Sequence, residues 1–213
     1  VRFYGLDPSR VVVVHLAGSL DPASAMPCAR LDLDKPYLLF VGVRTGYKNF
    51  DRFVRAVVPI LREQTDLQVV CVGGGAFTPG ERDLFDALRV HDRFAQAGVS
   101  DGELAGLYQG ARAFVFPSLY EGFGIPLLEA FACRCPCVIS EASCFPEIAA
   151  DAAAYFDPAS EVSMTGAIFK VISDETRRAE LVSRGLERAR SFSWARTAQE
   201  TIRVYQDVLA RGV

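Results

Sequence analysis

The sequence lacks the features that would mark a nucleic-acid-binding, membrane-spanning or secreted protein. Its formal net charge is −3 over 213 residues, so no basic surface for nucleic acid is expected. The apolar run Val11–Val14 is far shorter than a membrane span. No apolar region follows Val1–Phe3, so no signal peptide is predicted. We expect a cytoplasmic chain and, because it does not begin with methionine, a fragment of a longer protein.

Residues that could bind a metal ion are also scarce. The chain has two isolated histidines and six cysteines, three of which lie in the run CRCPC from Cys133 to Cys137. Cys133 is expected to end a helix and Cys137 to begin a strand, and no second Cys or His pair has the spacing of a zinc site. We therefore expect buried thiols in a reducing compartment and no metal site.

Apolar runs alternate with helical patterns along most of the chain. The apolar runs are continuous, which predicts strands of a parallel sheet covered on both faces. They are residues 37–42, 67–75, 93–99, 112–118, 137–140 and 152–158. A helical pattern follows each of the first four, and Asn49 is the predicted N-cap of the first helix. The predicted fold class is therefore α/β, a Rossmann-like parallel sheet flanked by helices.

The C-terminal part of the chain changes character. From about residue 161 the pattern predicts three consecutive helices, the last with Ser193 as its N-cap. This last helix carries an apolar stripe of Trp194, Ala198, Ile202, Tyr205 and Leu209. The looser stretch 21–36 is the one that resembles a domain boundary, so we divide the chain into residues 1–36 and residues 37–213.

Ligands of open parallel sheets bind outside the carboxyl ends of the strands. In this sequence the residues that follow the first five predicted strands are cations, glycines, carboxylates and hydroxyls. They are Arg44 and Lys48; Gly73, Gly74 and Gly75; Gly98 and Val99; Glu121 to Gly124; and Ser140, Glu141 and Ser143. Each has an ordinary interpretation as a turn residue or a solvated charge. Their combination along one edge of the sheet favours a binding site.

The chemistry of these residues fits a ligand that carries hydroxyl groups and negative charge, without yet fixing which ligand it is. Arg44 and Lys48 would bring positive charge beside a helix N-terminus, where phosphate is already favoured. Gly122 and Gly124 would leave backbone amides open to an anion or a sugar. Glu129, expected in the first turn of the following helix, could accept two ribose hydroxyls, and Glu121 could do the same for a hexose.

The segment EGFGIPLLE, from Glu121 to Glu129, is a quite specific E-x7-E element. With FVGVRTGYKNFDRFVRA and VVCVGGG, it resembles the C-terminal, donor-binding domain of retaining GT-B glycosyltransferases, the family called glycosyl transferases group 1. The resemblance runs from about Tyr37 to the end of the chain. It implies that residues 1–36 are the passage between two domains or a remnant of the N-terminal one, and that residues 37–213 bind a nucleotide-sugar donor.

The resemblance also implies roles for particular residues. Glu121 would contact the donor sugar near the reacting centre and act in catalysis, and Glu129 would hold the ribose. The other donor-binding residues would be Arg44 and Lys48 at the diphosphate, the backbone of Gly122, Phe123, Gly124 and Ile125 at sugar and phosphate, Val99 near the base, and Gly73 and Gly74. Arg44 departs from the usual pattern, because Val43 stands between it and Gly42.

The activity implied is transfer of a sugar, with retention of configuration, from GDP-mannose or a UDP-sugar to a saccharide or lipid-linked acceptor. Polysaccharide or lipopolysaccharide biosynthesis is the expected setting, and the expected location of the full-length enzyme is peripheral, at the inner membrane face. No metal and no cofactor are expected. The Asp32-Leu33-Asp34 triplet has the form that metal-dependent glycosyl transfer often uses, but it precedes a strand and is interpreted as linker acids. The acceptor domain would lie outside this chain, so the isolated chain is expected to transfer little.

Other classes remain open at this point. Half of a GT-B-fold sugar-nucleotide epimerase or phosphorylase is one alternative, although the sequence offers no clear additional acid–base pair and no clear lysine for pyridoxal phosphate. A non-catalytic nucleotide-binding or protein-interaction module is another. A Rossmann domain for NAD is disfavoured because the G-x-G-x-x-G fingerprint is missing.

Overall fold

The protein forms a six-stranded sheet in the computed structural model, which describes residues 5–210. All strands are parallel, in the order β3-β2-β1-β4-β5-β6. Their bounds are β1 Tyr37–Val41, β2 Gln68–Val72, β3 Phe94–Ala97, β4 Ala113–Phe116, β5 Cys137–Ser140 and β6 Ala154–Phe156. The α/β class and all six strands are thus as predicted. The prediction made for Val1–Phe3 concerns residues outside the described range.

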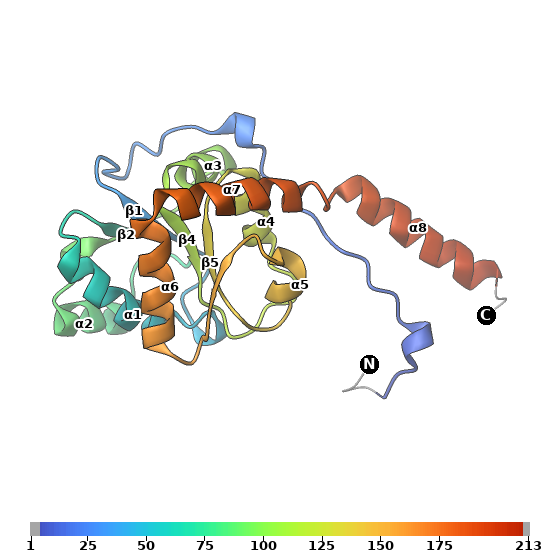
Figure 1. The fold of residues 1–213 in the computed structure, drawn as a ribbon, viewed down its shortest axis with the longest axis horizontal. Coiled ribbons are helices and arrows are strands. Elements are labelled where there is room, and N and C mark those ends of the chain that lie inside the picture. The colour runs from blue at the N-terminus through green and yellow to red at the C-terminus, as the bar shows by residue number, and fades with distance from the viewer. Residues whose placement is uncertain (1–4, 211–213) are drawn as a thin grey trace.

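Helices cover both faces of this sheet (Figure 1). They are α1 Phe50–Glu63, α2 Pro79–Leu88, α3 Asp101–Gly110, α4 Ile125–Ala132, α5 Phe145–Ala149, α6 Glu161–Ser173, α7 Glu175–Ala189 and α8 Trp194–Ala210. The short α5 lies in a stretch where the sequence analysis predicted no helix. Pro146 lies in the first turn of α5, a position where proline costs no helical hydrogen bond. The helix has only five residues, too few to show a clear apolar periodicity in the sequence.

Successive residues of the central strands point to opposite faces and build two cores. Leu39 and Phe114 belong to the core under α3, α4 and α5, whereas Leu38 and Val115 belong to the core under α1, α2 and α6. Because the central strands β1, β2, β4 and β5 are buried on both faces, their sequences are continuous apolar runs. This explains why the strands were predictable.

The predicted strands were longer than the observed ones where a strand is followed by glycines. β2 ends at Val72, and Gly73, Gly74 and Gly75 all adopt positive φ angles of 86°, 71° and 71°. Such angles take the chain out of extended geometry, so the glycines form the loop at the carboxyl end of the strand.

Both ends of the described chain extend away from the sheet (Figure 1). Helix α8 has no buried residue, and its predicted apolar stripe includes Trp194, 46 % exposed, and Leu209, 78 % exposed. The helix begins after Ser193 as predicted, with the Ser193 hydroxyl accepting from the Arg196 amide at 3.2 Å. Within residues 5–210 no helix combines the length and the apolar character that crossing a membrane requires.

Candidate functional site

The strand order reverses at the centre of the sheet, between β1 and β4. Ligands of doubly wound sheets bind at this switch point, outside the carboxyl ends of the two strands. Lys48 follows β1 and Glu121 follows β4, and the Lys48 Nζ and Glu121 Oε1 atoms lie 2.7 Å apart. The structure therefore places a cation and a carboxylate from two predicted ligand loops in direct contact at the switch point.

The Lys48 side chain is held in a narrow, largely aromatic setting. It is 10 % exposed, and its ammonium lies 4.9 Å from the centroid of the Phe116 ring. A Cβ atom added to Gly42, which has a φ of +127°, would lie 3.5 Å from the Lys48 Cε and Nζ atoms. The bare backbone of Gly42 therefore forms one wall of the space that the ammonium group occupies.

The Glu121 carboxylate is fixed by a chain of buried hydroxyls as well as by Lys48. The Ser118 Oγ donates to Glu121 Oε1 at 2.7 Å, and the Ser140 Oγ donates to the Ser118 carbonyl at 2.5 Å. Ser118 and Ser140 are fully buried, while the Glu121 side chain remains 13 % exposed. The buried hydroxyls therefore orient the Glu121 carboxylate from the protein side, and its exposed part remains open to a ligand.

The helices that begin at this edge next to the switch point leave their N-termini without side-chain caps. The residues before α1, α4 and α5 (Asn49, Gly124 and Cys144) make no capping hydrogen bond, whereas α2 and α3 each have a complete capping box. The free amides of a helix N-terminus and the helix dipole attract anions. The centre of the sheet edge is therefore suited to a phosphate group.

We call residues 121–124 the EGFG loop, and glycine occurs at two of its positions for different structural reasons. Gly124 has a φ of +94°, and an added Cβ atom would lie 3.1 Å from the Phe145 ring, so only glycine fits. Gly122 is exposed, and nothing lies within 4 Å of the position of an added Cβ atom. No contact with the described residues 5–210 requires glycine at position 122, and the open space beside it is available to a ligand.

Glu129 lies in the second turn of α4, not in the first turn as predicted. The helix begins at Ile125 because Gly124 is in the left-handed region, which makes Glu129 the fifth helical residue. Glu129 is partly buried, and its pKa is raised, first by burial and then by the nearby charge of Asp101. The structure thus offers a half-buried carboxylate with a destabilised negative charge, a group that a pair of hydroxyl donors would stabilise.

Replacing the Glu129 carboxylate by a neutral amide should affect the stability of the fold and the binding of a nucleotide in opposite directions. A raised pKa in the folded chain favours folding below the unfolded value of about 4.3, and this contribution is lost as the pH rises through the folded pKa. At pH 7 the ionised Glu129 therefore opposes folding. We expect Glu129→Gln to raise the thermal midpoint at neutral pH, with no gain near pH 4, and to weaken nucleotide binding about 10- to 100-fold. Scanning calorimetry at both pH values and titration calorimetry check the two halves. A lower midpoint at pH 7 would contradict the account.

Arg44 is directed away from the switch point in the structure. Its side chain is 2 % exposed, its Nε donates to Glu81 Oε1 at 2.8 Å, and its remaining nitrogens donate to carbonyls of the glycine loop. These acceptors are Gly73 at 2.7 Å, Gly75 at 2.9 Å and Ala76 at 3.0 Å. The guanidinium also lies over the Phe77 ring. Arg44, Gly73 and Gly74 are therefore brought together with one another, and Arg44 is not in contact with Lys48 or Glu121.

Some residues with evident structural roles here were missed by the sequence analysis. Glu81 was part of a predicted helix without any function, and only the fold places it against Arg44. Asn49 is the N-cap of α1 as predicted, but its side chain donates to the carbonyls of Pro117 and Pro158 instead of capping the helix. Asn49 thereby fastens the start of α1 to the loop after β4.

The aromatic residue of the EGFG loop packs against both chain extensions. The Phe123 ring lies 6.0 Å from the ring of His15, in the N-terminal extension, and 5.9 Å from the ring of Phe192, just before α8. His15 also contacts Glu147 of α5, with 2.8 Å between Nε2 and Oε1. Val99 is half-buried after β3 and packs against the core under α3 and α4.

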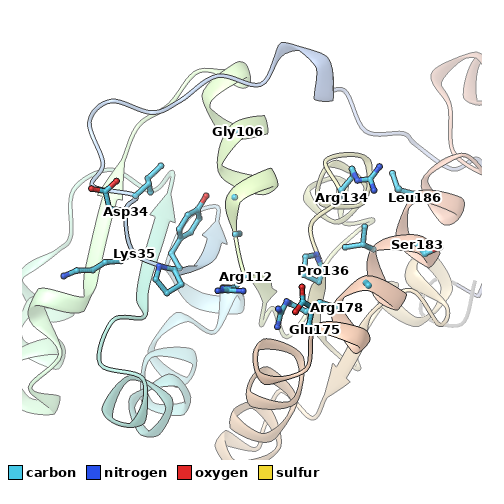
Figure 2. A pocket seen from close by; sticks show the side chains of 17 residues that line it. Asp34, Lys35, Gly106, Arg112, Arg134, Pro136, Glu175, Arg178, Ser183 and Leu186 are labelled. Atoms are coloured by element: carbon cyan, nitrogen blue, oxygen red, sulfur yellow. The ribbon is translucent and has the colours of Figure 1, made fainter.

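A hollow lies at the opposite edge of the sheet, at the amino ends of the strands (Figure 2). Its volume is about 870 Å³, and it is lined by residues such as Asp34, Arg112 and Arg134. Asp34 belongs to the D-x-D triplet, which the structure thus places away from the switch point. Within residues 5–210, no three His, Cys, Asp or Glu side chains are grouped so that they could hold a metal ion.

The parallel sheet, its helices and the helical tail form one half of a GT-B fold, with polar groups gathered at the switch point. The family "Glycosyl transferases group 1" matches residues 27–188. The chain therefore belongs to the glycosyl transferases group 1 family, and it corresponds to the C-terminal, donor-binding domain of such an enzyme.

Similar proteins agree with this assignment. Over 220 residues the chain is 30 % identical to O-antigen chain mannosyltransferase B of Escherichia coli, covering 97 % of this chain and 57 % of that protein. It is 33 % identical to D-inositol 3-phosphate glycosyltransferase of Kineococcus radiotolerans, covering 97 % and 54 %. The structure of sucrose-phosphate synthase from Thermosynechococcus elongatus superposes with a TM-score of 0.74 at 25 % identity, over 92 % of this chain and 52 % of that one. The chain spans about half the length of the curated relatives it matches.

Proposed function

We propose that this chain is the donor-binding half of a retaining, metal-independent glycosyltransferase. It would bind a nucleotide diphosphate sugar, such as GDP-mannose or a UDP-sugar, and present the sugar to a saccharide or lipid-linked acceptor held by another domain. The observation that carries the proposal is the contact between Lys48 and Glu121 at the switch point, 2.7 Å apart and beside the uncapped start of α4. The family assignment supports the reaction class.

In this proposal each group has a separate task. The Lys48 ammonium and the amides at the start of α4 bind the diphosphate and stabilise the negative charge that develops when it leaves. Glu121 accepts hydrogen bonds from hydroxyls of the donor sugar, and Glu129 accepts them from the ribose. The ribose and the sugar would then flank the diphosphate, because the two carboxylates lie at opposite ends of the EGFGIPLLE segment.

The acceptor and the setting follow from relatives by analogy. One relative is named as an O-antigen chain mannosyltransferase, so we propose a role in the assembly of a bacterial polysaccharide or lipopolysaccharide, with the full-length enzyme at the cytoplasmic face of the inner membrane. The isolated chain would bind its donor and transfer little sugar, because the acceptor must be oriented against the donor by a further domain.

Titration calorimetry of the 213-residue chain with GDP, UDP and ADP, and with the corresponding nucleotide sugars, tests the proposal. We expect one nucleotide to bind about tenfold or more tightly than the other two, a difference of about 1.4 kcal/mol. That binding should be weakened by Glu129→Ala. Equal binding of all three nucleotides, unaffected by this substitution, would favour a non-specific anion-binding module instead.

A further inference from the structure

The backbone of the EGFG loop is held by side chains from the neighbouring strand end. Ser143 and Cys144 lie in the turn between β5 and α5, and we call this pair the 143–144 clip. The Ser143 hydroxyl donates to the Glu121 carbonyl at 2.7 Å and accepts from the Glu121 amide at 3.3 Å. The Cys144 sulfur lies 3.4 Å from the Glu121 carbonyl oxygen and 3.2 Å from that of Phe123. The clip thus contacts both peptide groups of Glu121.

Among residues 5–210, the backbone of the loop from Tyr120 to Phe123 has no other hydrogen-bonded support. Across the part of the chain that the structure describes, no backbone–backbone hydrogen bond involves residues 120–123. The Glu121 side chain is held separately, by Lys48 and Ser118. The main chain and the side chain of Glu121 are therefore fixed by two independent sets of contacts, and the clip supplies the first.

Ser143 has an unusual backbone conformation for a residue with a side chain. Its φ is +55°, in the left-handed region that glycine adopts most readily. Glycine at this position would relax the backbone but could not make the two hydrogen bonds to Glu121. The serine hydroxyl is therefore the feature of position 143 that matters for the EGFG loop.

Cys144 is suited to donate to the loop. It is the one cysteine of the six that is only partly buried. It occupies the N-cap position of α5, yet makes no side-chain cap, and its sulfur faces the two loop carbonyls instead. Burial raises the pKa of the thiol, so at neutral pH it keeps its proton and can act as a hydrogen-bond donor.

We propose that Ser143 and Cys144 are positioning residues that set the orientation of Glu121 toward the donor sugar. They would act on recognition of the sugar more than of the nucleotide, because Lys48 and Glu129 bind the nucleotide from other parts of the site. This inference rests on the proposed donor-binding function, and the two can be tested separately.

The readout is the gain in affinity that the sugar provides. Calorimetry gives the Kd of the nucleoside diphosphate and of its nucleotide sugar, with GDP and GDP-mannose or UDP and UDP-glucose as the probes. Ser143→Ala keeps the Cβ atom and the backbone strain and removes only the hydroxyl. The sugar-dependent gain is the Kd of the nucleoside diphosphate divided by the Kd of the nucleotide sugar. We expect Ser143→Ala and Cys144→Val each to lower this ratio at least threefold. Cys144→Ser, which still has a donor, should keep most of the wild-type ratio. Ser183→Ala, an exposed serine of α7, is the matched control.

The possible results separate the clip from the site itself. Loss of the sugar-dependent gain in Glu121→Gln and in the clip variants supports the inference. Loss in Glu121→Gln with an unchanged ratio in Ser143→Ala and Cys144→Val overturns the clip and leaves the proposed function intact. An unchanged ratio in Glu121→Gln overturns the assignment of Glu121 to the sugar. If Cys144→Val does not fold, Ser143→Ala decides the question, because it removes only the hydroxyl and nearly conserves the side-chain volume.

Discussion

Replacement of Lys48 by alanine should nearly abolish donor binding. The Lys48 ammonium is 10 % exposed and lies at the switch point beside Glu121, so a phosphate bound there would form a largely desolvated ion pair with it. Truncation of one partner of such a pair costs about 2–4 kcal/mol, or roughly 30- to 700-fold in Kd. Titration calorimetry with the preferred nucleotide sugar measures the effect directly.

The chain offers a matched control for this substitution. Lys170, on the outside of α6, is exposed, and its replacement by alanine removes the same charge without touching the switch point. We expect the affinity of Lys170→Ala to stay within about twofold of the wild type, the small change typical of an exposed charge. If Lys48→Ala and Lys170→Ala bind the nucleotide sugar equally well, Lys48 has no role in the donor site.

Replacement of Arg44 by alanine should mainly reduce stability. The substitution would leave the buried Glu81 carboxylate without its partner and three loop carbonyls without their donor. Breaking a buried ion pair in this way costs about 3–5 kcal/mol. In a domain of this size, the thermal midpoint should then fall by about 10 °C or more. Scanning calorimetry at neutral pH gives this number.

A double-substitution cycle distinguishes this structural role from the predicted contact with the diphosphate. Arg44→Ala combined with Glu81→Ala should be less destabilising than the sum of the single substitutions, because the second removes the unpaired carboxylate. At a low temperature where all variants are folded, donor affinity should change much less than in Lys48→Ala. An unchanged midpoint together with a large loss of affinity would assign Arg44 to the diphosphate instead.

The fold could be predicted from the sequence because it depends on continuous apolar runs. Strands such as β1 and β4 are buried on both faces, so each leaves an uninterrupted signal bounded by glycine or proline. The helix α5 left no such signal because it has only five residues. Glu129 was expected in the first turn of α4, but counted from Ile125, where the helix begins, it is the fifth helical residue and lies in the second turn.

The candidate site was predictable in part for a different reason. The rule that ligand groups follow the strands of a parallel sheet indicated Lys48 and Glu121, and the structure brings these two together. The rule could not say in which direction a side chain points. Arg44 follows the same strand as Lys48, but the positive φ angles of the neighbouring glycine loop expose carbonyls that bind its guanidinium. Such side-chain orientations depend on long-range contacts, as with Glu81, and the sequence alone does not reveal them.

The central claim is that a nucleotide sugar binds at the carboxyl edge of the sheet, at the switch point between β1 and β4. The most direct test is to follow the backbone amide resonances of the chain by NMR during titration with the preferred nucleotide sugar. We predict saturable shifts at Lys48, Glu121, Gly122 and Glu129, with little change around Arg112 and Arg134 at the opposite edge. Shifts concentrated around Arg112 and Arg134, with none at Lys48 and Glu121, would contradict the account.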